Sequence, residues 1–199
     1  MTDAAATSDP AGARILAAAA ARFAHEGFER TRLADVARDA GLAVGTIYLR
    51  HHDKAALLAA VLAGLEGRFA TAMDAPDIWA VPWPARFAAV FAAVFELAMR
   101  DGSARHLMAL SPYAGAEGWR RGDRIRAVIA RHVSQGQAEG RFHTDLEPSF
   151  VAAITFGMVD GAMEAVMANT DLGPDGAVRH LAQAAERWLC LPPEGGISR

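Results

Sequence analysis

The chain has 199 residues, of which 52% are hydrophobic and 22% are charged, a balance that excludes a disordered or fibrous protein. Its net charge of −3 does not mark a nucleic-acid-binding protein, although such binding depends on cations at one surface rather than on the total charge. The single cysteine, Cys190, excludes an internal disulfide and a cysteine-rich metal site.

The first predicted helix runs from about residue 12 to residue 26. Ile15, Ala19 and Phe23 recur at four-residue spacing, which places them on one face of this helix. Charged residues interrupt its apolar run too early for a secretory signal, and no stretch of the chain approaches the roughly 20 apolar residues of a membrane span. We therefore expect a cytoplasmic protein without a membrane partner.

Two short helices joined by a glycine turn are predicted next. Thr31 stands at the N-cap position of the first of them, and apolar residues from Leu33 to Ala40 follow the spacing i, i+3, i+4, i+7. Gly41 follows the last of these and can adopt the left-handed conformation that ends a helix. The pattern predicts one short amphipathic helix and a tight turn.

The second short helix has a single inward residue, Ile47. Thr46, Tyr48 and Arg50 are expected to face outward, so that hydroxyl groups and a cation lie on one side. Two helices at a steep angle, the second with such an outer face, form the helix-turn-helix arrangement that enters a DNA major groove.

The rest of the chain reads as further helices. A fourth helix is predicted from a cap at Asp53 to about Met73, on the order of 30 Å long and able to bridge two domains. Residues 75–84 contain three prolines and two tryptophans, which predicts a loop. Later helices are expected at about 85–100, 103–110, 118–139, 147–168 and 174–191. Since no alternating strand pattern occurs, the predicted fold class is all-α.

Residues 14–62 resemble the N-terminal domain of the TetR family of bacterial transcriptional regulators. The resemblance covers about a quarter of the chain. The matching residues are Ile15, Ala19, Phe23, Gly27, Phe28, Thr31, Asp35, Val36, Ala37, Ala40, Gly41, Gly45, Thr46, Ile47, Tyr48, Lys54, Leu57 and Leu58. It implies a three-helix DNA-binding domain at residues 12–62 and a larger helical domain at residues 63–191 that binds an effector and dimerises.

The resemblance also implies which residues contact DNA. In the family, the tyrosine and the lysine that match Tyr48 and Lys54 hold the DNA backbone. The expected DNA-binding residues are Thr31, Arg32, Val44, Gly45, Thr46, Tyr48, Leu49, Arg50 and Lys54. Hydroxyl groups and cations at these positions suit phosphate oxygens. The alternative is that Tyr48 only packs the domain and that Arg50 is a solvated surface residue.

The chain departs from the family pattern at three positions. Ala43 and Val44 replace a capping residue and a polar residue, and His51 replaces a common aromatic residue. Base recognition is then expected to rest on contact between thymine methyl groups and Val44 or Leu49. The alternative is that the domain has lost strong operator binding.

Neither metal chemistry nor catalysis is expected. His51 and His52 are adjacent on a helix end and therefore point in different directions, and no other histidine or cysteine lies close in sequence. No serine has the context of a nucleophile motif, and no glycine-rich phosphate loop follows a strand. We expect no cofactor and no enzymatic activity.

An effector pocket is predicted in the second half, where members of the family bind small molecules. Its expected lining is Phe87, Phe91, Phe95, Met99, His106, Met108, Tyr113, Phe156, Asp160 and Met163. Apolar side chains with a few polar anchors suit a small apolar or aromatic effector. Phenylalanine and methionine also fill ordinary cores, which is the alternative for each of these residues.

The last two helices are expected to form a homodimer. In the helix at 147–168, four small residues keep one face open to close approach: Ala153, Gly157, Gly161 and Ala165. In the helix at 174–191, six residues form an apolar stripe: Val178, Leu181, Ala182, Ala185, Trp188 and Leu189. Members of the family pair these helices across a two-fold axis as a four-helix bundle. The alternative is that both faces are buried within one subunit.

These features predict a homodimeric repressor that binds a pseudo-palindromic operator in double-stranded DNA and is released by a small-molecule effector. The competing hypothesis is a helical small-molecule-binding or interaction protein that has lost operator binding. Ala43, Val44 and the balanced charge of the first 62 residues support this alternative.

Overall fold

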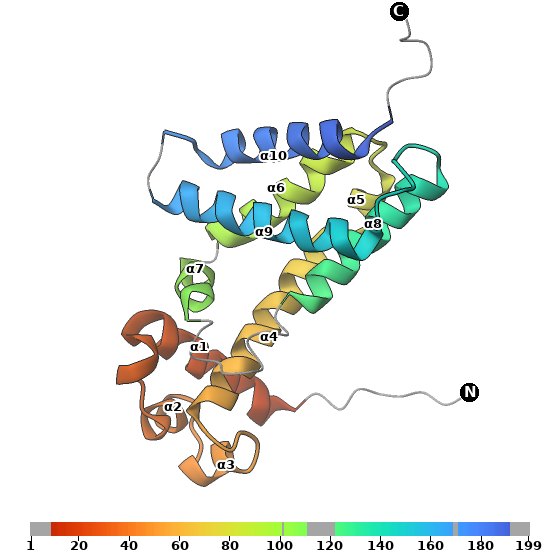
Figure 1. Cartoon of the computed structure of the whole chain (residues 1–199). Coiled ribbons are helices and arrows are strands. Elements are labelled where there is room, and N and C mark those ends of the chain that lie inside the picture. The colour runs from red at the N-terminus through yellow and green to blue at the C-terminus, as the bar shows by residue number, and fades with distance from the viewer. Residues whose placement is uncertain (1–8, 101, 111–121, 169–170, 192–199) are drawn as a thin grey trace, which may run out of the picture. The chain divides into compact units, whose positions relative to one another are not determined.

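The computed structural model describes residues 9–100, 102–110, 122–168 and 171–191 (Figure 1). These residues form ten helices and one isolated bridge, between Phe142 and Cys190, so the predicted all-α class is confirmed. The helices are α1 (Pro10–Arg30), α2 (Leu33–Asp39), α3 (Val44–Tyr48), α4 (Lys54–Met73), α5 (Pro76–Ala80), α6 (Ala85–Arg100), α7 (Gly102–Ala109), α8 (Asp123–Ala138), α9 (Pro148–Met167) and α10 (Pro174–Leu189).

The chain divides into two compact units. The first unit is residues 1–65 with 101–121, and the second unit is residues 66–100 with 122–199. The helix α4 therefore contributes to both units, and α7 belongs with α1, against which it packs. The functional boundary predicted after residue 62 remains a prediction.

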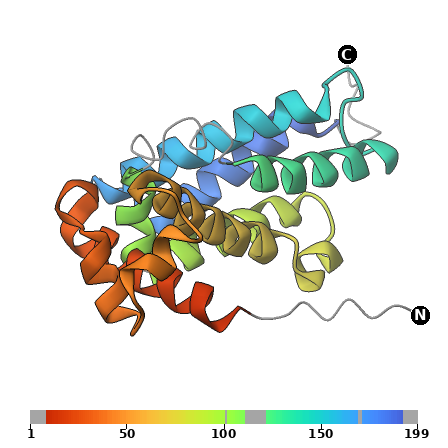
Figure 2. The same cartoon turned by 90° about the horizontal axis from the view of Figure 1, so that it is seen from below.

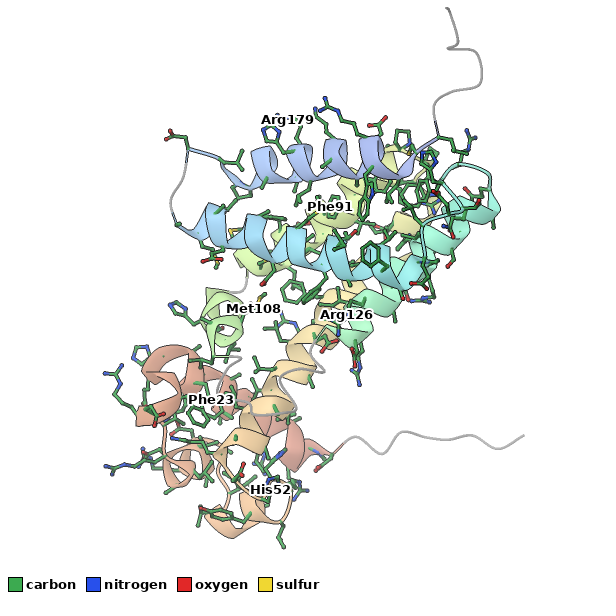
Figure 3. The ribbon with its side chains drawn as sticks, viewed as in Figure 1. Phe23, His52, Phe91, Met108, Arg126 and Arg179 are labelled. Atoms are coloured by element: carbon green, nitrogen blue, oxygen red, sulfur yellow. The ribbon has the colours of Figure 1, made fainter. Side chains whose placement is uncertain are left out.

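The core of the first unit forms where α1, α2, α3 and the start of α4 meet. Ile15, Phe23 and Ile47 are almost completely buried there, and Figure 3 shows Phe23 inside this group of helices. Asp53 accepts a hydrogen bond from the Ala56 amide at 2.7 Å, which confirms the predicted cap of α4. Gly41 has φ 64°, which confirms the predicted left-handed turn after α2.

The predicted cap at Thr31 is wrong. Its hydroxyl donates to the Gly27 carbonyl at 2.7 Å instead of accepting from the first turn of α2, whose N-cap is Arg32. Gly27 has φ 79° and breaks α1 into two segments, which turns its carbonyl toward the hydroxyl. The buried Thr31 side chain therefore closes α1 rather than opening α2.

In the second unit, α10 packs against α6 and α9, and α8 packs against α9 (Figure 2). The bounds of α6 agree with the prediction. The predicted loop at residues 75–84 is wrong in part, because Pro76 begins the short helix α5. Proline is favourable in a first helical turn, where its missing amide has no partner in any case.

The prediction that no stretch of the chain approaches a membrane span is wrong by length and composition, because two helical segments among the described residues are long and apolar enough to cross a membrane. Residues Lys54–Ala80 and Pro148–Met167 contain 18-residue windows with mean hydropathy of 1.4 and 1.5. Core helices of water-soluble proteins pass the same test, so this composition is weak evidence for a membrane span.

Candidate nucleic-acid interface

The turn between α2 and α3 is held by backbone hydrogen bonds. The Leu42 amide donates to the Ala37 carbonyl at 2.9 Å, and the Gly41 amide donates to the Arg38 carbonyl at 3.0 Å. Ile47 is completely buried and fixes α3 against the rest of the unit. The opposite side of α3 therefore faces solvent.

Large side chains cover this solvent-facing side of α3. Leu49 is 85% exposed, Tyr48 is 56% exposed and Val44 is 41% exposed. A Cβ atom added at Gly45 would meet nothing within 4 Å, so this part of the helix is open to a close approach. Apolar side chains gathered on an exposed face often mark a binding surface. This face is suited to a DNA major groove, because thymine presents a methyl group there.

Lys54 lies beside this face but already has partners. Its Nζ donates to the carbonyls of Glu29 at 3.1 Å and Thr31 at 3.2 Å, and it lies 4.4 Å from the centroid of the Phe28 ring. Because an ammonium group has three N–H donors, one remains for a phosphate oxygen. Lys54 thus holds the turn between α1 and α2, and its predicted DNA contact remains a prediction.

The other predicted contacts differ in accessibility. Thr31 is buried, so its side chain can support the surface but not form it. Arg32 is exposed and, among the described residues, has no ion-pair partner. Thr46 is half-buried at the start of α3. Arg32 is therefore the predicted cation best placed to meet a phosphate.

Arg50 is paired with Asp9, which precedes α1. Its Nε and Nη2 atoms donate to the two carboxylate oxygens of Asp9, each at 3.1 Å. The hydrogen bond from Arg50 lowers the pKa of the Asp9 carboxyl below its ordinary value. This pair could not be predicted from the sequence, because its partners are 41 positions apart.

The two histidines after α3 have different surroundings. Burial, followed by the charges of Arg50 and His52, lowers the pKa of His51. The Nε2 atom of His52 lies 3.2 Å from a carboxylate oxygen of Asp53. No group of three or more histidine, cysteine, aspartate or glutamate side chains among the described residues is arranged to hold a metal ion.

The predicted effector-binding residues are divided between the two units. Phe87, Phe91, Phe95 and Met163 are buried in the second unit, where Met99 and Phe156 are half-buried and Asp160 is exposed. His106 and Met108 lie on α7 in the first unit, and Tyr113 lies outside the described residues. The Phe87 ring stacks on Phe142 with 5.5 Å between centroids, as ordinary core residues do. The lining of an effector pocket remains a prediction.

A surface groove in the second unit was not predicted from the sequence. Its volume is about 470 Å³, and none of the predicted effector-binding residues lines it. The lining residues are Pro84, Ala85, Ala88, Asp175, Val178, Arg179, Ala182, Gln183 and Glu186. Figure 3 shows Arg179 pointing away from α10 at this surface. The groove uses two members of the predicted dimer stripe, Val178 and Ala182.

A buried polar cluster in the second unit was also not predicted from the sequence. Arg86 is only 5% exposed, and it donates to the carbonyls of Val81 at 2.6 Å and Trp79 at 2.9 Å and to Gln135 Oε1 at 2.9 Å. The ring of His132 stacks on Trp79 with 3.9 Å between centroids. The only sequence signal is a cation within the aromatic start of α6, which does not reveal partners on another helix.

The two predicted dimer faces are used differently. On α9, Ala153, Gly157 and Gly161 are exposed, together with Phe150 and Ile154. On α10, three of the six predicted stripe residues, Leu181, Ala185 and Leu189, are buried within their own unit, and the other three are half-buried. Because α10 packs on α6 and α9, the exposed face of α9 is the stronger candidate for contact with a second copy.

Residues 15–61 match the family model described as bacterial regulatory proteins of the tetR family. Residues 15–61 are therefore similar to the N-terminal region of TetR-family proteins, and the match covers about a quarter of the chain. No curated protein sequence matches the chain. The match covers the helix-turn-helix and its supporting helices, so the chain carries the DNA-binding fold of this family of transcriptional regulators.

Solved structures share the fold of this chain along most of its length. The fatty acid degradation regulator FadR from Bacillus halodurans has a TM-score of 0.75 at 19% identity, covering 87% of this chain and 93% of its own. FadR from Bacillus subtilis, solved with stearoyl-CoA, has a TM-score of 0.73 at 20% identity, covering 86% and 95%. A TetR-family protein from Vibrio parahaemolyticus has a TM-score of 0.69 at 25% identity, covering 92% and 100%.

Proposed function

We propose that this protein is a homodimeric transcriptional repressor that binds a pseudo-palindromic operator and releases it when an effector binds. The observation that carries the proposal is the outer face of α3, where Leu49 is 85% exposed while Ile47 beneath it is completely buried. Large side chains gathered on one exposed face of a well-anchored helix often mark a binding surface. The methyl groups of thymine in the major groove are suitable partners for such a face.

The exposed face of α9 supports the homodimer. Phe150 is 58% exposed and Ile154 is 42% exposed, and Gly157 and Gly161 continue the same face along the helix. A Cβ atom at either glycine would meet nothing within 4 Å, so a second helix can approach closely. In the proposed dimer, the two α3 helices would enter successive major grooves of the operator, about 34 Å apart.

The effector is proposed to be small and apolar or aromatic. The structural similarity to FadR from Bacillus subtilis, solved with stearoyl-CoA, supports an effector with an apolar group such as an acyl chain. A ligand that prefers the conformation with low DNA affinity weakens operator binding. By thermodynamic linkage, operator DNA weakens ligand binding by the same factor.

A mobility-shift assay with DNA from upstream of the protein's own gene tests the proposal. Arg32→Ala and Tyr48→Phe should each weaken binding, by up to about tenfold, because each removes a group suited to a phosphate oxygen. Arg179→Ala removes a matched exposed cation from α10 and should leave binding unchanged. If the unmodified protein binds no promoter fragment at low salt, the repressor is excluded and the small-molecule-binding alternative stands.

A separate measurement tests the dimer. Ile154→Glu places a charge on the exposed face of α9 and should convert the protein to monomers in sedimentation-velocity analysis, because a buried unpaired charge is costly. Ala127→Glu changes an exposed residue of α8 and serves as the control. A dimer that persists in the Ile154 variant would rule out this face.

A further inference from the structure

The residue before α1 contacts the edge of the proposed DNA surface of the first unit through one ion pair. Asp9 precedes α1, and Arg50 follows α3 by two residues. Both carboxylate oxygens of Asp9 accept from Arg50, with N–O distances of 3.1 Å. This two-point contact is the geometry with which a guanidinium also binds phosphate. Asp9 therefore occupies two guanidinium donors that could otherwise bind a phosphate group.

The position of the Asp9 carboxylate depends on a glycine in the first turn of α1. A Cβ atom at Gly12 would lie 2.5 Å from Asp9 Oδ2 and 3.1 Å from its Cγ, so a larger residue would force the carboxylate to move. The charge is also favourable at this place, because the N-terminus of a helix carries a partial positive charge. Glycine and helix together hold the carboxylate where it meets Arg50.

The pair is accessible to an exchanging anion. The Arg50 side chain is 33% exposed and the Asp9 side chain is 52% exposed. Exposed ion pairs are weak and are screened by salt, so a phosphate group can replace the carboxylate without unfolding any element. Arg50 lies next to Leu49, the most exposed large apolar residue of the described chain, which places the pair at the border of the proposed DNA surface.

We propose that Asp9 is an internal competitor of DNA phosphate for Arg50, and that it weakens binding to DNA that lacks the operator sequence. This inference rests on the proposed DNA-binding function. A duplex offering only phosphates must displace Asp9 and overcome its negative charge, whereas an operator also offers base contacts to α3. Asp9 thus improves discrimination by lowering the sequence-independent part of the affinity.

The test uses the full-length protein and a fluorescein-labelled duplex of mixed sequence that spans two major grooves, with anisotropy measured over a range of NaCl concentrations. Asp9→Asn should tighten binding several-fold at low salt and steepen the plot of log K against log salt by about 0.9 for each phosphate gained. Gly12→Ala keeps the charge but displaces the carboxylate, so it should shift affinity in the same direction by a smaller factor.

Two further variants separate the specific contact from a general charge effect. Asp39→Asn removes the same charge from the first unit but releases Arg22, with which Asp39 pairs at 2.6 Å, rather than Arg50. Its effect should be smaller than that of Asp9→Asn. Arg50→Ala should cost little affinity in the unmodified protein and much more in the Asp9→Asn protein.

The outcomes distinguish this inference from the proposed function. Equal gains for Asp9→Asn and Asp39→Asn, or a gain from Asp9→Asn that persists when Arg50 is alanine, would overturn the inference while DNA binding itself stands. Absence of duplex binding by the unmodified protein and every variant at low salt would overturn both.

Discussion

The helices α3 and α6 use their large side chains in opposite ways. In the first unit, α3 buries Ile47 and leaves Tyr48 and Leu49 in solvent. In the second unit, α6 buries Phe91 and Phe95 almost completely. The contrast shows that an apolar residue identifies a binding surface only when the fold leaves it exposed. An aromatic row in a sequence is a weaker signal, because stability alone accounts for it.

The largest expected effect tests whether the phenylalanine residues of α6 are packed in the core. Phe95→Ala removes a buried ring and leaves a cavity, so the free energy of unfolding should fall by about 3–5 kcal/mol. Urea denaturation followed by circular dichroism measures it. If the free energy of unfolding falls only as little as it does for a substitution at an exposed site, the ring faces an open pocket rather than a packed core.

Arg86→Ala should have the next largest effect. The change leaves two backbone carbonyls and Gln135 Oε1 without their donor, which should lower the free energy of unfolding by about 2–3 kcal/mol. Arg179→Ala, on the exposed side of α10, is the matched arginine control and should be close to neutral in the same denaturation assay. Equal stability of the two variants would show that the buried cluster contributes nothing.

His132 makes stability depend on pH. Burial lowers its pKa below the ordinary value and outweighs the hydrogen bond with the Met73 carbonyl, which raises the pKa. The nearby charges have smaller effects, since Arg86 and Arg131 lower the pKa and Asp74 raises it. Stability is therefore complete above the unfolded pKa of about 6.5 and is lost as pH falls through and below it, by at most about 1.4 kcal/mol per pH unit.

Urea denaturation at pH 7.5 and at more acidic pH measures this loss. His132→Phe keeps an aromatic ring beside Trp79 but cannot be protonated, so its stability should vary less with pH. The His51 pKa is lowered as well, and its contribution is common to both proteins. Identical pH dependence in the two proteins would exclude His132 as a source.

The smallest expected effect on stability tests whether the exposed side chains at α3 contribute to DNA binding rather than to folding. Leu49→Ala should change the free energy of unfolding by less than about 0.5 kcal/mol, because the side chain is 85% exposed. Its effect on operator affinity should be larger, about 1–2 kcal/mol, if it contacts base methyl groups. Calorimetry and a DNA-binding assay on the same preparation compare the two. An unchanged affinity would remove Leu49 from the proposed surface.

Features set by neighbouring residues could be predicted from the sequence. Gly41 and the cap at Asp53 were predicted correctly, because each depends on residues within one helical turn. The bounds of α6 followed from apolar spacing and from Pro84 before it. Such signals also fixed the outer face of α3, since Ile47 is the residue that its spacing turns inward.

Features set by distant residues could not be predicted. Arg86 meets Gln135 across 49 positions, and Lys54 meets the carbonyls of Glu29 and Thr31 across 25 and 23 positions. The failed cap at Thr31 has a related cause, because the broken helix at Gly27 offers its hydroxyl a closer acceptor than α2 does. Local propensity does not contain this information, since the choice between two acceptors depends on how the backbone bends.

Lys54 has one more consequence, because it is the only lysine in the chain. Reductive methylation with isotope-enriched formaldehyde would therefore mark a single side chain, in addition to the terminal amine. The dimethylated nitrogen keeps its charge, so its resonance would report whether a duplex draws the amine away from the carbonyls of Glu29 and Thr31. The chain thus contains its own spectroscopic reporter beside the proposed recognition helix.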